Sequence, residues 1–269
     1  MIKNNICDNI DMKIFKGVFG LKKIKKLSTL AIIGTTLLTL TGCSNDKDVS
    51  IKEKNISHNI SKDVTFADSN DSRIWLLIDA NKEEQIAKEA TINAVIQTKN
   101  GKYVTYRPES YECTLEKIAN MKDSDIVSNA KKLDEENFNN QKQRALEDYD
   151  DILKYTTNTN DIEKVELARK KIEGITYKTP SWENISINLK KDNNNKETLE
   201  EAITLSNRVF QEDTYATVTG SLTFSVPVST TEVLGEFYTG YATENRKTLL
   251  ITKVDKEYQK MELDKKEVK

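Results

Sequence analysis

The stretch from Thr214 to Val228 constrains the fold most strongly, because apolar and polar residues alternate along it. The odd positions are mostly threonine or serine, and the apolar residues at the even positions are Ala216, Val218, Leu222, Phe224, Val226 and Val228. Successive side chains of a strand point to opposite faces, so this pattern predicts a long strand with one face in solvent. Pro227 lies on the solvent side and has no N–H, which predicts an edge position near the end of the strand.

Other strands are predicted on both sides of the middle of the chain. RIWLLID (residues 73–79) is a short apolar run, typical of a strand buried on both faces. Asn100-Gly101 separates two apolar runs and adopts positive φ at low cost, which predicts a tight hairpin. ENISINLK (183–190) alternates, and the C-terminal antiparallel strands are expected within 214–263.

The middle of the chain has a helical period. Apolar residues from Ile126 to Ile152 recur at helical spacing, and Asn160 and Gly174 are expected to bracket a second helix, which predicts a helical hairpin over 124–174. Asn195 is expected to cap a third helix, with an apolar stripe at Leu199, Ala202, Ile203, Ser206, Val209 and Phe210. The predicted fold is therefore a single α+β domain over 72–269, with antiparallel strands at both ends and a helical block in the middle.

The charge is unevenly distributed along the 269 residues. Residues 1–42 carry seven Lys or Arg and two Asp, which leaves 34 basic and 41 acidic side chains from Cys43 onward. The acidic part of the chain, from Cys43 onward, gains no binding free energy from the release of counterions. We therefore expect no nucleic-acid partner and no attraction to an anionic lipid surface.

The N-terminal part has the layout of a secretory signal. A cluster of lysines between Lys22 and Lys26 precedes an apolar run over 27–42, which is short for a helix that spans a bilayer. The run ends in Leu40-Thr41-Gly42-Cys43, which resembles the lipobox of bacterial lipoprotein precursors at all four positions. An uncleaved membrane segment, or an ordinary signal peptide with an accidental cysteine, is the alternative. The start of the chain is either Met1 or Met12.

The lipobox resemblance implies an anchor and a location. It implies a signal peptide over 1–42, cleavage between Gly42 and Cys43, and a diacylglycerol on the Cys43 thiol. Two acyl chains hold a protein stably at a membrane, here at the outer face of the cell membrane. Residues 43–71 are polar and predict a flexible tether. In its layout the chain resembles small accessory lipoproteins of plasmids and conjugative elements in Gram-positive bacteria.

The sequence provides little material for catalysis. His58 is the only histidine and lies in the predicted tether, so one chain cannot form a histidine-based triad or a multi-histidine metal centre. Cys113 has no histidine as a base and is expected to be a buried thiol, and Trp75 and Trp182 are expected in the core. The acids between Glu147 and Asp151 lack calcium-loop spacing and indicate a solvated helix face. We expect no enzymatic activity, no metal site and no cofactor.

Aromatic residues in the C-terminal strands are the remaining candidates for a binding surface. Tyr215, Phe237, Tyr238 and Tyr241 form a possible protein-binding surface, although aromatic residues are also good strand formers. The expected function is that of a lipid-anchored accessory protein that binds or scaffolds other proteins. The alternatives are a substrate-binding lipoprotein of a transporter, a glycan hydrolase that uses carboxylates alone, and the precursor of a pheromone cut from residues 35–42.

Overall fold

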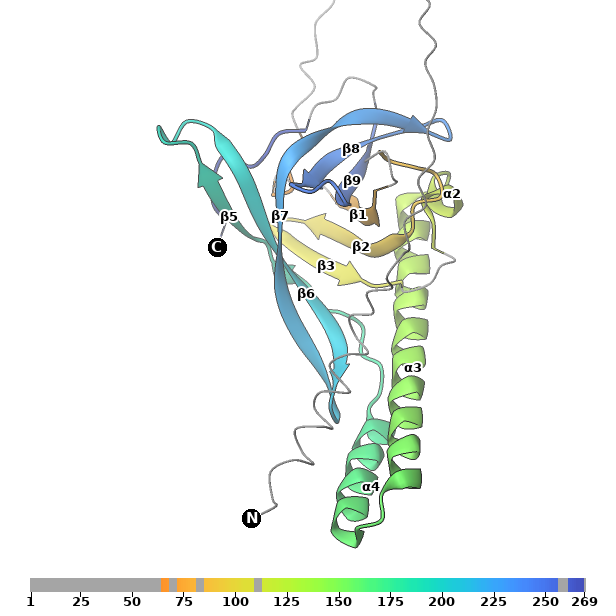
Figure 1. Ribbon diagram of the computed structural model, residues 1–269. Coiled ribbons are helices and arrows are strands. Elements are labelled where there is room, and N and C mark those ends of the chain that lie inside the picture. The colour runs from red at the N-terminus through yellow and green to blue at the C-terminus, as the bar shows by residue number, and fades with distance from the viewer. Residues whose placement is uncertain (1–63, 68–71, 81–84, 109–112, 256–260, 269) are drawn as a thin grey trace, which may run out of the picture. The chain divides into compact units, whose positions relative to one another are not determined.

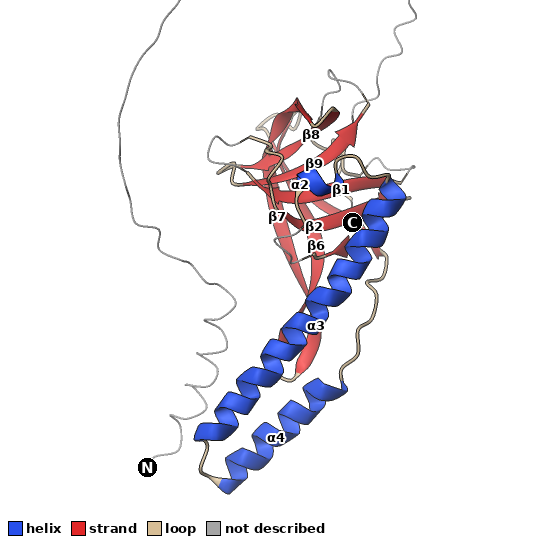
Figure 2. Cartoon of the chain, turned by 90° about the vertical axis from the view of Figure 1, so that its right-hand side faces the viewer, coloured by secondary structure: helices blue, strands red, loops and turns tan. Residues whose placement is uncertain are grey.

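The computed structural model describes residues 64–67, 72–80, 85–108, 113–255 and 261–268 (Figure 1). In this part of the chain a nine-stranded antiparallel sheet is accompanied by three helices (Figure 2). The strands are β1 (Arg73–Asp79), β2 (Ile92–Lys99), β3 (Lys102–Tyr106), β4 (Glu183–Asn184), β5 (Ser186–Lys191), β6 (Thr198–Gln211), β7 (Thr214–Val233), β8 (Glu236–Thr243) and β9 (Thr248–Val254). The helices are α2 (Leu115–Ile118), α3 (Asp123–Tyr155) and α4 (Thr159–Gly174). The strand order is β4-β3-β2-β1-β9-β8-β7-β6-β5.

The two ends of the sheet are consecutive in the chain. β4 pairs with β3 and β5 pairs with β6, and only Ile185 separates β4 from β5. The Ile185 N–H donates to the Gly101 carbonyl oxygen at 2.9 Å, at the turn between β2 and β3. The sheet therefore curls round until its first and last strands meet, and it is nearly closed and barrel-like.

The inner face of the curled sheet holds one apolar cluster, which we name the inner cluster. It includes residues from strands at both ends of the order, which requires a concave face: Trp75, Leu77, Ala94, Ile96, Tyr103, Ile187, Ile203, Phe224, Tyr241 and Leu250 are among them. A second cluster, which we name the outer cluster, covers the outer face of β1, β2, β3, β8 and β9, where α2 and the first turns of α3 pack. β1 is buried from Ile74 to Ile78 because it lies between the two clusters. Each cluster removes apolar surface from water, which is the main source of stability.

The predicted β2–β3 hairpin is confirmed. Asn100 and Gly101 adopt φ of +51° and +70°, as a tight hairpin turn requires, and β2 and β3 pair from Val95↔Tyr106 to Lys99↔Lys102. Trp75 is fully buried, as expected. Trp182 is 43% exposed, so its predicted place in the core is wrong. It lies immediately before β4, outside both apolar clusters.

Helices α3 and α4 lie side by side and antiparallel, within the segment for which the sequence predicts a helical hairpin (Figures 1 and 2). The cap of α4 is Asn158, whose side chain accepts a hydrogen bond from the Asn160 N–H at 2.9 Å, whereas the sequence predicts Asn160 as the cap. The first turn of the helix thus begins two residues earlier than predicted.

The predicted fold class is wrong, because strands and not a helical block dominate the described residues. The main cause is the segment after Asn195, which is predicted as a helix and is strand β6. The spacing of its apolar residues fits both a helical period and a strand period. Eleven positions pair with β7, from Glu201↔Phe224 to Gln211↔Thr214, and this pairing makes the segment a strand. Long-range pairing overrides a local pattern in such cases.

The boundaries of the domain also differ from the prediction. Val64 pairs with Met261 and Phe66 is fully buried against the Trp75 ring, although both residues fall within the predicted tether. Their burial closes one side of the inner cluster. At the other end of the chain, the last strand, β9, ends at Val254, within the range 214–263 predicted for the C-terminal strands.

Strand β7 changes partners along its length. Its first part pairs with β6, its second part pairs with β8, and Phe224 belongs to both ladders. The β6–β7 hairpin therefore extends beyond the body of the sheet (Figure 1). We name the extended part of this hairpin, residues 205–223, the arm.

Candidate functional site

The arm forms one wall of a cleft of about 950 Å³. The opposite walls come from the end of β3, the middle of α3, the end of α4 and the linker 175–182 between α4 and β4. The charged lining residues are Arg107, Asp134, Lys170, Lys171, Lys178, Glu183, Arg208 and Asp213, and Thr105, Ser206, Tyr215 and Thr217 line it as well.

Asp134 of α3 is the polar centre of this region. Its carboxylate is buried and accepts hydrogen bonds from the Arg107 N–H at 2.8 Å and from the Tyr177 hydroxyl at 2.7 Å. The Arg208 guanidinium of the arm forms an ion pair with it at 3.1 Å. Asp134 therefore joins the end of β3, the linker and the arm to one turn of α3. Such a buried carboxylate needs all of these donors, because unpaired burial of a charge is costly.

Arg208 is held in a second way, by aromatic rings. Its guanidinium lies 5.4 Å from the Tyr177 ring centre and 5.3 Å from the Tyr215 ring centre, and it also donates to the Lys178 carbonyl oxygen. Phe138 of α3 packs against Tyr215 and Phe210 with ring centres at 4.9 and 5.4 Å. The arm is thus fixed to α3 by a small aromatic cluster around one buried ion pair.

Burial raises the pKa of Tyr177 far above its ordinary value, and the hydrogen bond to Asp134 raises it further. The hydroxyl therefore stays protonated and continues to donate to the carboxylate. Tyr177 is a positioning residue for Asp134 and Arg208 and has no acid–base role at neutral pH.

A second polar cluster lies where β3, β4 and β6 meet. The Glu183 carboxylate accepts hydrogen bonds from the Tyr103 hydroxyl at 3.0 Å and from the Ser206 hydroxyl at 2.5 Å, and the Ser206 N–H donates to the Tyr103 oxygen. Burial raises the pKa of Tyr103 above its ordinary value. These bonds close the sheet at the base of the arm.

Most of the charged side chains that line the cleft are cationic. Five Lys and Arg side chains line it against three carboxylates. Asp134 is paired with Arg208, and Asp213 is paired with Lys171 at 2.6 Å. Lys170 and Lys178 are exposed and have no ion-pair partner among the described residues. The cleft therefore offers positive charge in a chain that is acidic from Cys43 onward.

The four aromatic residues predicted as a binding surface do not form one. Tyr238 and Tyr241 are buried, Tyr238 in the outer cluster and Tyr241 in the inner cluster. Phe237 is half-buried in β8, and Tyr215 is half-buried in the cleft wall. The prediction is wrong for Tyr238 and Tyr241, because their positions in β8 alternate between the two covered faces of the sheet.

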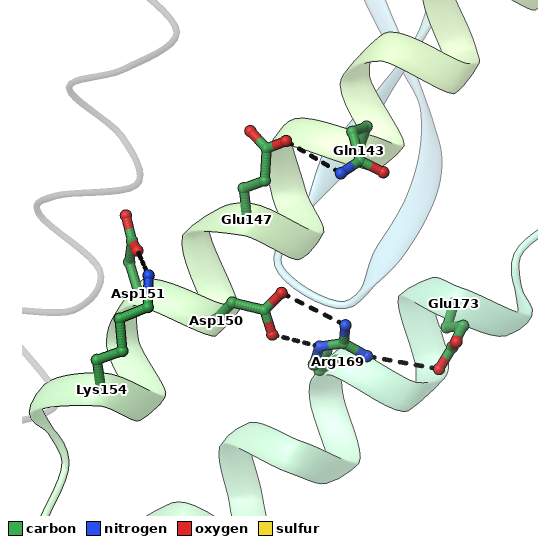
Figure 3. Close-up of polar contacts among 7 residues, drawn as sticks. All are labelled: Gln143, Glu147, Asp150, Asp151, Lys154, Arg169 and Glu173. Atoms are coloured by element: carbon green, nitrogen blue, oxygen red, sulfur yellow. Dashed lines mark hydrogen bonds and ion pairs between the residues drawn. The ribbon is translucent and has the colours of Figure 1, made fainter.

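Two further predictions concern thiols and acids. Cys113 is buried and its pKa is raised to about 11 by burial, as expected for an unreactive thiol. Figure 3 shows the acids of α3 on a helix surface, where Glu147 accepts from Gln143, Asp151 pairs with Lys154 and Asp150 pairs with Arg169 of α4. The described residues contain no group of three His, Cys, Asp or Glu side chains that could hold a metal ion.

Gly42, Cys43 and His58 lie outside the described residues, as does the segment 35–42. The lipid attachment, the cleavage site and the pheromone therefore stay predictions. No helix within the described ranges is long and apolar enough to span a bilayer.

The key residues of the cleft were not predicted from the sequence. Asp134, Tyr177 and Arg208 come from three separate elements, and Arg208 lies in the segment predicted as a helix. One signal was present: Asp134 interrupts the apolar stripe of α3 between Ala130 and Phe138, at helical spacing from both. A charge within an apolar stripe indicates a buried polar contact.

Comparison of the chain with protein-family models, with curated proteins and with solved structures finds no match.

Proposed function

We propose that the protein is a lipid-anchored accessory protein at the outer face of the cell membrane, and that its cleft binds an extended, acidic segment of another protein. The lipobox residues Leu40 to Cys43 support the anchor. The observation that carries the binding role is the excess of positive charge in the cleft, in a chain that is otherwise acidic. Such local charge selects and steers an oppositely charged partner.

The lining of the cleft fits a polypeptide ligand. Hydroxyl groups of Ser181, Thr214 and Thr217 line the cleft together with Lys170 and Lys178, and the linker 175–182 forms one wall. The Thr105 hydroxyl is buried in the wall and has no hydrogen-bond partner within the described residues. The exposed hydroxyl groups and the two lysines provide donors for the backbone carbonyls and carboxylates of a polypeptide.

The anchor is tested by the variant Cys43→Ala. It should abolish membrane retention and the incorporation of a labelled fatty acid, because the acyl chains provide the binding energy. An unchanged membrane fraction would refute the anchor.

The cleft is tested by crosslinking on intact cells. A photo-crosslinking amino acid at Thr176, which lines the cleft, should capture a partner whose captured segment is rich in Asp and Glu. The double variant Lys170→Glu, Lys178→Glu should reduce the yield about tenfold or more, since a loss of 1.4 kcal/mol in binding is tenfold in affinity. Lys99→Glu, an exposed lysine in β2 outside the cleft, is the matched control and should leave the yield unchanged. An unchanged yield in the double variant would contradict the charge-based role.

A second function, the capture of a small solute for a transporter, has one observation in its favour. The cleft volume lies within the range of small-molecule sites, which is about 300–1,000 Å³. A solute that raises the unfolding temperature of the wild type, but not of the variant Arg208→Ala, would favour this alternative over a protein partner.

A further inference from the structure

The outer edge of the arm, on strand β7, has no pairing strand in the described part of the chain. β7 pairs with β6 through the arm, but its pairing with β8 begins only at Phe224. The residues Thr217, Thr219, Gly220 and Ser221 are exposed, and Val218 is 38% exposed. An open edge of this kind presents backbone N–H and C=O groups to another strand.

The hydrogen bonds of β6 show which groups point outward. The Ser206 N–H donates to the Tyr103 hydroxyl, at 3.0 Å, and therefore points away from β7. Ser206 lies opposite Thr219, so this is a non-hydrogen-bonded pair, and the Thr219 N–H and C=O also point away from β6. By the alternation of antiparallel strands, the same holds for Thr217 and Ser221. The 3.2 Å distance between the Thr204 and Ser221 side-chain oxygens agrees, since side chains are closest in such pairs.

This edge lacks the features that normally protect an edge strand. Proteins block exposed edges with charged residues, prolines or bulges. The second half of β7 has Pro227 and two register shifts, whereas the β6–β7 ladder has no register shift and the stretch from Thr214 to Thr223 has no charged residue and no proline.

Gly220 is a further indication that another backbone approaches here. Its φ is not positive, and a Cβ atom added to it would have no atom within 4 Å. Glycine weakens a strand, so neither its own conformation nor packing within the monomer explains it. Close approach of a second backbone is a common reason for glycine in a strand.

We propose that this edge pairs with the same edge of a second copy of the chain, antiparallel and about a two-fold axis at Thr219. In this register Thr217 of one copy lies opposite Ser221 of the other, and Val218 lies opposite Gly220. The outward N–H and C=O groups of Thr217, Thr219 and Ser221 then find partners, in about six backbone hydrogen bonds. The occupant is a second copy because the edge is complementary to itself: it is uncharged, hydroxyl faces hydroxyl, and each valine faces a glycine. Of the cleft lining, this edge contains Thr217 but neither Lys170 nor Lys178.

Disulfide trapping on intact cells tests the register with the full chain in its own membrane. In a hydrogen-bonded antiparallel pair, the Cα atoms are about 5.5 Å apart, which suits a disulfide. The variant Thr219→Cys should form a covalent homodimer on mild oxidation, and Ser229→Cys, an exposed position in the other half of β7, should not. A crosslink from Thr219→Cys to a different protein, no crosslink in folded protein, or equal crosslinking at both positions would each overturn the proposal.

A charge exchange gives a second, independent readout. Thr219→Lys places two like charges opposite each other at the two-fold axis and should weaken self-association of the purified full chain in detergent about tenfold or more, and Thr219→Glu should do the same. A mixture of the two variants should restore the dimer, which sedimentation velocity measures. If the mixture stays monomeric while each variant is folded by circular dichroism, the two-fold pairing is wrong.

Discussion

The inner cluster of the sheet and the arm are parts of the same β-sheet, but they are held together by different forces. The inner cluster collects buried apolar side chains from strands all round the sheet. Most residues of the arm are exposed or half-buried, and the arm is fixed to α3 through Asp134, Arg208 and the rings around Phe138. Apolar burial is spread over many contacts, whereas the attachment of the arm depends on a few. We therefore infer that the arm separates from α3 at a lower free energy than the sheet unfolds.

The largest expected effect is in the inner cluster. Trp75 is fully buried, stacks on Tyr241 and donates from Nε1 to the Thr98 hydroxyl at 3.2 Å. Trp75→Ala should lower the free energy of unfolding by about 3–5 kcal/mol, because it leaves a large cavity. Chemical denaturation measures this loss. Trp182→Ala, at a 43% exposed position, is the matched control and should change stability by much less. Equal losses would contradict the assigned difference in burial.

The next effect concerns the attachment of the arm. Asp134→Ala removes the acceptor for Arg107, Tyr177 and Arg208, and should cost about 3 kcal/mol because it leaves the half-buried Arg208 cation and two further donors without their partner. Hydrogen exchange should show faster exchange in the arm, residues 205–223, with little change in β1 and β9. Asp148→Ala, on the exposed surface of the same helix, should have no such effect. A uniform increase over the whole sheet would show that the arm and the inner cluster unfold together.

The same contrast explains what could be predicted from the sequence. The β2–β3 hairpin follows from Asn100-Gly101, because the turn chemistry is local. β6 was missed because the contacts that make it a strand are with β7, and its spacing at Ile203, Ser206 and Phe210 fits a helix equally well. The place of Val64 and Phe66 depends on Met261 and Trp75, which are far away in the sequence. Local rules thus recover the hairpin turn, α3, α4 and the clearly patterned strands β1 and β7, whereas long-range pairing decides β6 and the place of residues 64–67.

The cleft was less predictable than the fold. Its centre brings together Asp134, Tyr177 and Arg208, whose separation along the chain gives no common motif. Aromatic residues in strands suggested a binding surface, but Tyr238 and Tyr241 fill the two faces of the sheet. Of the four residues, Tyr215 lies in the cleft, because the arm carries it beyond the body of the sheet.

A third prediction concerns the pH dependence of folding stability. Glu201 of β6 is fully buried, and burial together with the negative charge of Asp264 raises its pKa to about 8. The folded state therefore holds a proton that the unfolded state, with an ordinary pKa of 4.5, releases at lower pH. Stability should fall as pH rises from about 5 to 8, because the folded state binds more protons in this range.

Glu201→Gln should remove this fall, since glutamine does not titrate. Thermal unfolding at a series of pH values measures the difference between the variant and the wild type. Glu200→Gln, the neighbouring residue that pairs with Lys190 on the surface, should keep the wild-type slope. A variant slope equal to that of the wild type would show that the buried carboxyl does not cause the pH dependence.

The smallest effect is expected outside both clusters, at the surface pair between α3 and α4 (Figure 3). The Arg169 guanidinium donates to Asp150 from Nε at 2.6 Å, and this bond holds the pKa of Asp150 below its usual value. The pair therefore stabilises the fold above the ordinary pKa of an aspartate and loses this effect as pH falls through the lowered pKa. Exposed ion pairs contribute little and are screened by salt. Arg169→Ala should thus shift the unfolding temperature less than Trp75→Ala or Asp134→Ala, and added salt should shrink the shift. If the shift instead matched that of Asp134→Ala, an exposed ion pair would contribute as much as the contacts that fix the arm, and the attachment of the arm would no longer depend on a few buried contacts.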